Sequence, residues 1–217
     1  MRILIVSLLF VATQVFSVKA QQQDDAEYTK VLTERSMKIV NTLDIKEKAV
    51  FDRVTEIIVN QYKSLGKIHD SHDAEAALVK KNDVDKAAVE AKLSFLAQQR
   101  DLSLFRLHNT YLGNLSAELT NDQVEKVKDG MTYGVVMVTY NSYTDMIPSL
   151  KDYEKRQLMA WLIEAREHAM DAASSKKKHE WFGKYKGRFN NYLSKQGYDI
   201  QKERDEWNKR IAAKKKK

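Results

Sequence analysis

Long stretches of this chain repeat apolar residues with the period of an α-helix, and almost no stretch alternates in the way a half-buried strand does. One proline and seven glycines are too few for a collagen-like or low-complexity chain. The pattern predicts an all-α protein, a single-domain bundle of about six to seven helices over residues 21–217. The expected helices run from about Tyr28 to Leu43, from Phe51 to Leu65 and on toward Val79, from Asp83 or Asp85 to Leu115, from Thr120, from about Leu150 to Ala173 and from Trp181 to Leu193.

Residues 131–148 carry mixed signals. Three β-branched valines between residues 135 and 138 favour a strand, whereas Tyr140 and Tyr143 have helical spacing. No other stretch offers a partner strand of similar quality, so a sheet is not expected. We predict an irregular segment near residues 130–140, extended or turn-like, followed by a short helix that Pro148 ends.

Three places in the sequence combine an N-cap residue with an acceptor-bearing side chain three residues later. Such a pair satisfies two backbone N–H groups that a helix start leaves without partners. It therefore predicts helix starts at Asp44 with Glu47, at Thr120 with Gln123 and, more loosely, at Ser149 with Asp152.

The N-terminus has the pattern of a secretory signal peptide. Arg2 precedes an apolar run from Ile3 to Ala12, and Val18 and Ala20 suit the positions before a signal-peptidase site. We predict cleavage after Ala20 and export to the periplasm or beyond the cell. The alternative is an uncleaved anchor, although the run is short for a membrane span.

Charge and cysteine content exclude several classes. The chain has no cysteine, which excludes a disulfide scaffold, a thiolate zinc site and a cysteine nucleophile. Lys and Arg (37) exceed Asp and Glu (30), and part of the excess lies in the terminal run Lys214 to Lys217. Such a run is typical of a frayed, solvated end, so no nucleic-acid partner is expected.

Two histidines in the segment IHDSHD could contribute to a metal site. His69 and His72 are three residues apart on one helix face, with Asp70 and Asp73 beside them. No third ligand is evident, so the interpretation we favour is a solvated or partly packed helix face, with no metal and no cofactor. The sequence also contains no phosphate loop, GxSxG elbow, HExxH site or dinucleotide fingerprint.

A row of ionisable residues follows in the segment WLIEAREHAMDA. Glu164, His168 and Asp171 are four and three residues apart, which lines them up along one side of a helix. Such a row could tune the imidazole for acid–base work or coordinate a cation. An ion row that merely stabilises the helix, with Arg166 and Glu167 beside it, is the simpler interpretation.

The segment HEWFGKYKGRFNNYLS interleaves aromatic, cationic and amide side chains. Gly183 and Gly187 leave a strip of bare backbone that a helix or a ligand could approach. Flat apolar rings beside hydrogen-bond donors are what a sugar site needs, but the same spacing also serves an aromatic core stripe with a solvated face. The candidate ligand-binding residues are Glu164, His168, Asp171, Trp181, Lys184, Tyr185, Arg188 and Asn191.

Residues 119–148, 159–194 and 197–199, from LTNDQVEKVKDG through HEWFGKYKGRFNNYLS to GYD, resemble a family of exported bacterial proteins of unknown function. Some members carry a sugar-binding label, and members tend to occur beside polysaccharide-degrading genes. The resemblance implies an exported, all-helical protein and agrees with a carbohydrate ligand. It brings no known set of ligand residues or reaction with it.

Three functions remain open at this stage. The first is a carbohydrate-binding or accessory protein in polysaccharide utilisation. The second is a chaperone-like or structural interaction protein, because Leu119 to Gln123 is similar to the Leu-Thr-x-x-Gln motif of small periplasmic stress chaperones. The third is a polysaccharide-active enzyme that uses His168 with a neighbouring carboxylate, although no catalytic set can be identified and we lean against catalysis.

Overall fold

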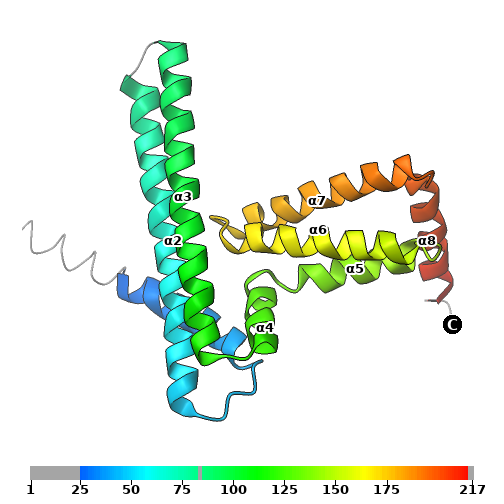
Figure 1. Ribbon diagram of the computed structural model, residues 1–217, viewed down its shortest axis with the longest axis horizontal. Helices are drawn as coiled ribbons and strands as arrows, with labels where there is room; N and C mark the ends of the chain where they lie inside the picture. The colour runs from blue at the N-terminus through cyan, green and yellow to red at the C-terminus, as the bar shows by residue number, and fades with distance from the viewer. Residues whose placement is uncertain (1–24, 83–84, 215–217) are drawn as a thin grey trace, which may run out of the picture. The chain divides into compact units, whose positions relative to one another are not determined.

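A computed structural model describes residues 25–82 and 85–214, and within these ranges every regular element is a helix. The all-α prediction is therefore confirmed. A helix over residues 25–40 comes first. The others, labelled in Figure 1, are α2 (Lys48–Asn82), α3 (Lys86–Glu118), α4 (Asn121–Met131), α5 (Val135–Met146), α6 (Asp152–Met170), α7 (Ser175–Lys195) and α8 (Ile200–Lys214).

Two of the sequence predictions fall on residues outside the described ranges. The signal peptide predicted for residues 1–20 is one, and all but the first residue of the terminal lysine run is the other. Among the helices that are described, none is both long enough and apolar enough to cross a bilayer.

The chain divides into two compact units, one up to Lys63 and one from Ser64 onward, so that α2 contributes to both. In the first unit the predicted apolar stripe is buried at Leu32, Ile39 and Leu43, while Tyr28 is exposed. The helix start predicted at Asp44 is wrong. Asp44 has a φ of 55°, lies in the turn after the first helix and precedes the start of α2 by four residues.

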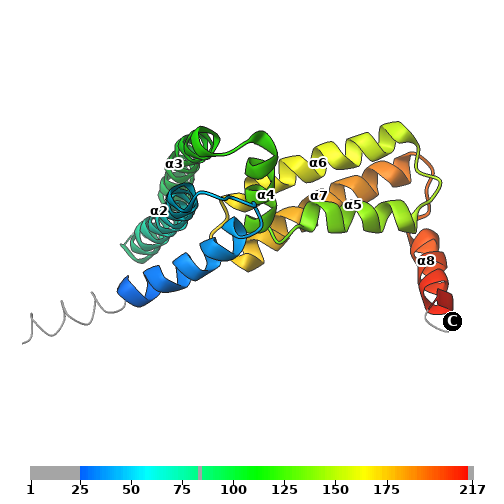
Figure 2. The ribbon, with the colours of Figure 1, turned by 90° about the horizontal axis from the view of Figure 1, so that it is seen from below.

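The core of the second unit lies among α5, α6 and α7, which run side by side in both Figure 1 and Figure 2. The helix α6 buries Leu158, Leu162, Ala165 and Ala169, which are spaced as one stripe. The facing stripe of α7 consists of Phe182, Tyr185, Phe189 and Leu193. The antiparallel packing of α6 against α7 determines which side chains of the two helices stay outside the core. These side chains form the candidate site.

The predicted irregular segment is a turn of only three residues, Thr132 to Gly134, in which Tyr133 and Gly134 have φ values of 61° and 64°. The valines that follow belong to α5, so the expectation of an extended segment over them is wrong. Val136 and Tyr143 are buried in the core on one face of α5, and this burial outweighs the β-branched preference for a strand. The predicted end is confirmed, since α5 stops at Met146, before the proline.

The other two capping predictions have different outcomes. Thr120 and Gln123 form the predicted capping box, with the Thr120 N–H donating to Gln123 Oε1 at 3.0 Å. Ser149 is not the cap of α6. That helix begins two residues later than predicted, and its first turn is closed by the Lys151 N–H donating to Glu154 Oε2 at 2.8 Å.

The helix α8 has no counterpart among the predicted six or seven helices. None of its residues is fully buried, and Ile200 and Trp207 only partly cover the core. Its apolar positions are too sparse to form the repeating stripe from which the other helices were predicted.

The part of α2 from Ser64 onward lies beside α3 in both views. Within α3 only Tyr111 and Leu115 are buried, and both lie in its last third. Phe95, Leu102 and Phe105 are exposed. The hairpin formed by α3 and the part of α2 from Ser64 onward therefore buries few apolar side chains near the connection between the two helices.

Candidate functional site

The outward side chains of α6 and α7 form what we call the α6–α7 face, which comprises Trp161, Glu164, His168, Trp181, Lys184, Arg188, Asn191, Tyr192 and Lys195. Gly183 and Gly187 also lie on the outer side of α7. A Cβ added to either glycine would meet no atom within 4 Å. The strip is therefore not a packing surface for another helix of the described chain and remains open to a ligand.

His168 and Trp181 stack on each other at one end of this face, with ring centroids 4.4 Å apart and planes 14° from parallel. The Lys184 ammonium lies 4.9 Å from the centre of the same indole. Trp181 is thus already engaged by two side chains. Its ring is a less open platform than the sequence suggested.

Tyr185 belongs to the core and not to the face. It is buried in the inner stripe of α7, and burial together with the nearby Glu164 carboxylate raises the pKa of its hydroxyl to about 12. For this residue the core-stripe interpretation was the right one.

Arg188 connects the two helices across the middle of the face. Its guanidinium lies 4.4 Å from the centre of the Trp161 indole and 3.5 Å from Glu164 Oε2. Both partners of that ion pair are about half exposed, at 53% and 48%, so water screens the attraction between them. The stacked guanidinium keeps most of its donors available.

A concavity of about 600 Å³ lies beside Arg188 and is lined by Trp161, Lys184, Gly187, Arg188, Asn191, Tyr192 and Lys195. Trp161 and Tyr192 meet edge to face at 5.5 Å, and both rings also contact buried Phe189. These contacts fix the positions of Trp161 and Tyr192, the two aromatic side chains that line the concavity. Three of the predicted residues, Lys184, Arg188 and Asn191, line this concavity.

Trp161, Tyr192 and Lys195 also line this hollow, although they were not among the predicted site residues. Tyr192 lay on the aromatic spacing that the sequence displays, and Trp161 lay in the segment of the ionisable row. The sequence does not show that α6 packs against α7. Only this packing brings the Trp161 and Tyr192 rings together on one side of the concavity.

Asp171 is not part of the face, although the sequence placed it in a row with His168. It follows the last turn of α6, and its Oδ2 lies 2.8 Å from His108 Nδ1 of α3. Its carbonyl oxygen lies 2.8 Å from His69 Nε2 of α2. Nor does His168 form a hydrogen bond with Glu164 or Asp171 in the described structure, which leaves an enzyme based on that row without an assembled acid–base pair.

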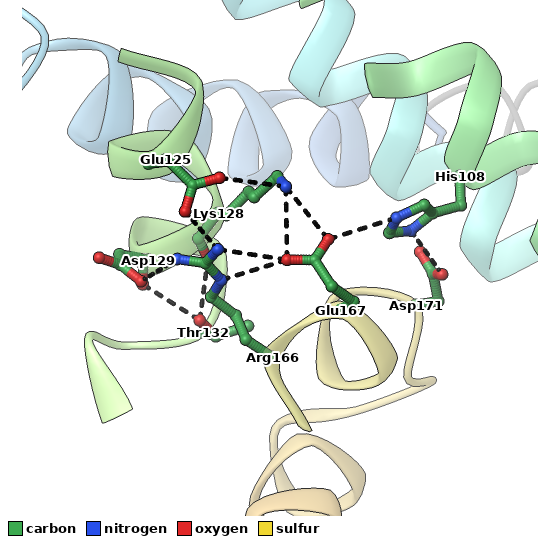
Figure 3. A network of polar contacts seen from close by, with 8 residues as sticks. All are labelled: His108, Glu125, Lys128, Asp129, Thr132, Arg166, Glu167 and Asp171. Carbon is green, nitrogen blue, oxygen red and sulfur yellow. Dashed lines mark hydrogen bonds and ion pairs between the residues drawn. The ribbon is translucent and has the colours of Figure 1, made fainter. Parts of the chain in front are cut away.

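Asp171 instead belongs to a mostly buried ion network that joins α3, α4 and α6 (Figure 3). Arg166, whose side chain is 4% exposed, lies at its centre. Its guanidinium donates to Asp129 at 2.9 Å and to Glu167 at 3.2 Å, and it is also hydrogen-bonded to Glu125. Lys128 lies 3.2 Å from both Glu125 and Glu167.

His108 closes the other end of this network. Its Nδ1 faces Asp171 and its Nε2 lies 3.4 Å from Glu167 Oε2. Hydrogen bonds to Asp171 and Glu167 raise the pKa of His108 to about 9, so the ring is a cation that donates from both nitrogens at neutral pH. Burial opposes ionisation of Glu167, but the His108 hydrogen bond and the charges of Lys128 and Arg166 hold its pKa at about 2.

The network pairs charges between helices, whereas the sequence suggested a row along one helix. None of its members lines the concavity on the α6–α7 face. We assign it to holding α3, α4 and α6 together.

The two histidines considered for a metal site, His69 and His72, have different partners. His69 Nε2 lies near the Asp171 carbonyl oxygen, and His72 Nδ1 lies 3.0 Å from Asp73 Oδ1. No cluster of three or more metal-ligating side chains occurs among the described residues.

No curated protein matches the sequence. A family model described as "Protein of unknown function (DUF3826)" matches residues 29–213, which is most of the chain. The chain therefore belongs to the DUF3826 family of proteins of unknown function.

Proposed function

We propose that this protein is exported and binds carbohydrate in the concavity of the α6–α7 face, as a binding or accessory protein in polysaccharide utilisation. The observation that carries the proposal is the composition of the hollow. Tyr192 offers ring surface to the CH face of a sugar, and Trp161, with the Arg188 guanidinium over its indole, lies beside Tyr192. Arg188, Asn191 and Lys195 offer donors to the sugar hydroxyls. A volume of about 600 Å³ is within the range of small-molecule sites.

The accessible backbone of Gly187 also supports the proposal. Because no side chain covers this position, a flat sugar ring can lie across the helix between Arg188 and Asn191. A bulky residue there would occupy the hollow without disturbing the core beneath it.

The first test is a thermal-shift screen of the purified protein against fragments of plant and host polysaccharides. A ligand present at about 100 times its Kd adds about 2.7 kcal/mol of stability. For a chain of this size that raises Tm by about 5–10 °C.

The test of the site is Gly187→Leu. This change should abolish the sugar-induced shift while stabilising the unliganded helix by about 0.5–1 kcal/mol, since leucine is the better helix former. Gly113→Leu is the matched control, because Gly113 lies within α3 with equally open space around it and outside the concavity. Equal loss of binding in both variants, or retained binding in Gly187→Leu, would refute the assignment.

A second candidate function rests on a different hollow. A concavity of about 520 Å³ between α2 and α3 is lined mainly by apolar side chains, and its Leu78 and Phe95 are 57% and 59% exposed. Exposed apolar surface of this kind suits the docking of an apolar segment from a partner protein, as in the chaperone-like alternative.

This candidate predicts that the protein suppresses the aggregation of reduced insulin, followed by light scattering. Phe95→Glu should remove that activity, while Val138→Glu, at a similarly exposed apolar residue on α5, should not. Absence of suppression by the unchanged protein would eliminate the candidate and leave the carbohydrate proposal untouched.

A further inference from the structure

The concavity on the α6–α7 face is strongly one-sided in charge. Lys184, Arg188 and Lys195 line it, and no carboxylate does. A neutral sugar can accept hydrogen bonds from these cations, but it cannot neutralise their mutual repulsion, whereas an anionic ligand can. The three cations therefore indicate the charge of the ligand, which the aromatic side chains of the concavity do not.

These cations are incompletely neutralised by the protein itself. Arg188 has one half-exposed carboxylate partner, Glu164, at 3.5 Å. Among the described residues, the Lys184 ammonium lies over the Trp181 ring and has no ion pair, and the Lys195 side chain has neither a hydrogen bond nor an ion pair. The buried network differs sharply, because Arg166 and Lys128 there have two or three carboxylates each.

The spacing of the charges limits the ligand further. Lys184, Arg188, Asn191 and Lys195 follow one strip of α7 at intervals of four, three and four residues. With a rise of 1.5 Å per residue, the cations are about 6 Å and about 10 Å apart along the helix axis. A ligand with one acidic group can neutralise one or two of them, whereas an oligomer with repeated acidic groups can reach all three.

We propose that the ligand of this concavity is an acidic oligosaccharide, with a carboxylate or sulfate group on successive sugars. This rests on the proposed carbohydrate function and narrows its substrate class. The sugar rings lie against Tyr192 and over the bare backbone of Gly187, beside the Trp161 indole that Arg188 stacks on, while the acidic groups pair with the cations on the strip. Arginine and lysine favour carboxylate and sulfate over hydroxyl groups because charge-assisted hydrogen bonds are the stronger ones.

The experiment is calorimetric titration of the purified protein with oligogalacturonate, with its fully methyl-esterified form and with ι-carrageenan oligosaccharides. The first carries carboxylates, the second is the same sugar without charge, and the third carries sulfate alone. At least one acidic oligosaccharide should bind about tenfold or more tightly than the methyl ester. Which of the two does so identifies the acidic group.

The affinity for the acidic ligand should fall as salt concentration rises, because screening weakens charge pairing more than ring stacking. The double variant Lys184→Gln with Lys195→Gln should lose about tenfold for the acidic oligosaccharide and little for the ester. Lys186→Gln is the matched control, an exposed lysine of α7 outside the concavity. All three side chains are exposed, and Tm of each variant verifies the fold.

The failures are distinguishable. Equal affinity for the oligogalacturonate and its ester, lost in Gly187→Leu, would overturn the acidic class and leave the carbohydrate function standing. Absence of binding to every sugar tested would overturn both. Tighter binding of a single-stranded oligodeoxythymidylate than of either acidic sugar would also overturn the proposal, since stacked rings with cations can serve that ligand as well.

Discussion

The ion network makes a quantitative prediction at His108. Its pKa is about 9 in the folded protein, against an ordinary value of 6.5, because Asp171 and Glu167 hold the charged ring. The shift is equivalent to about 3 kcal/mol of folding free energy. The His108 side chain is only 16% exposed, so solvent screening removes little of this contribution.

The sign follows from the direction of the shift. Since the folded-state pKa lies above the unfolded one, the stabilisation is complete below about pH 6.5 and is lost as the pH rises through about 9. At acidic pH the sign is reversed, because the pKa of Glu167 is lower in the folded protein than in the unfolded chain. The contribution of Glu167 to the free energy of unfolding is therefore complete above about pH 4.5 and is lost as the pH falls towards 2. The network therefore stabilises the protein most between about pH 4.5 and 6.5.

The perturbation is His108→Gln, with urea unfolding measured at pH 6 and at pH 10. The variant should be less stable at pH 6, and the difference from the unchanged protein should shrink by about 3 kcal/mol at pH 10, about 6–12 °C in Tm. His179→Gln is the control, because His179 is exposed and has no ion pair among the described residues. A stability difference that stays constant between the two pH values would refute the role assigned to His108.

Three further predictions concern other parts of the chain. Arg166→Met should cost about 3–5 kcal/mol in urea unfolding, because it leaves Asp129 and Glu167 without their buried partner; a cost below about 1 kcal/mol would contradict the network. Thr120→Ala should cost about 0.5–2 kcal/mol through loss of the capping box, with a Tm decrease of a few degrees as the readout and an unchanged Tm as the contrary result. Mass spectrometry of the protein recovered from the periplasm or medium should find Gln21 as the first residue, and an intact Met1 there would rule out the predicted cleavage.

The helices could be predicted from the sequence where local chemistry decides them. The apolar stripes of the first helix and of α6, and the capping box at Thr120, depend on residues within a few positions of one another. The prediction failed at the valines of α5, where a strand preference was outweighed by burial of Val136 and Tyr143 in a core that the sequence does not display.

In the candidate site, too, contacts between helices could not be predicted from the sequence. Helical spacing put Glu164 and His168 on one side of a helix, and both are exposed on α6. Lys184, Arg188 and Asn191, which the sequence interleaves with aromatic residues, are exposed on α7. Spacing cannot reveal which helix comes to face a given side chain, so it could not separate Asp171 from His168. The partner of Asp171, His108, is 63 residues away in the chain.

The scarcity of buried residues in α3 has a dynamic consequence. From Lys86 to Thr110 the helix has no fully buried residue, so its backbone amides are protected mainly by hydrogen bonds that water can reach. These amides should exchange with deuterium through small local openings, well before those near Tyr111 and Leu115. The binding of a partner protein to residues 86–110 would therefore slow amide exchange in these residues, even if no other helix changed on binding.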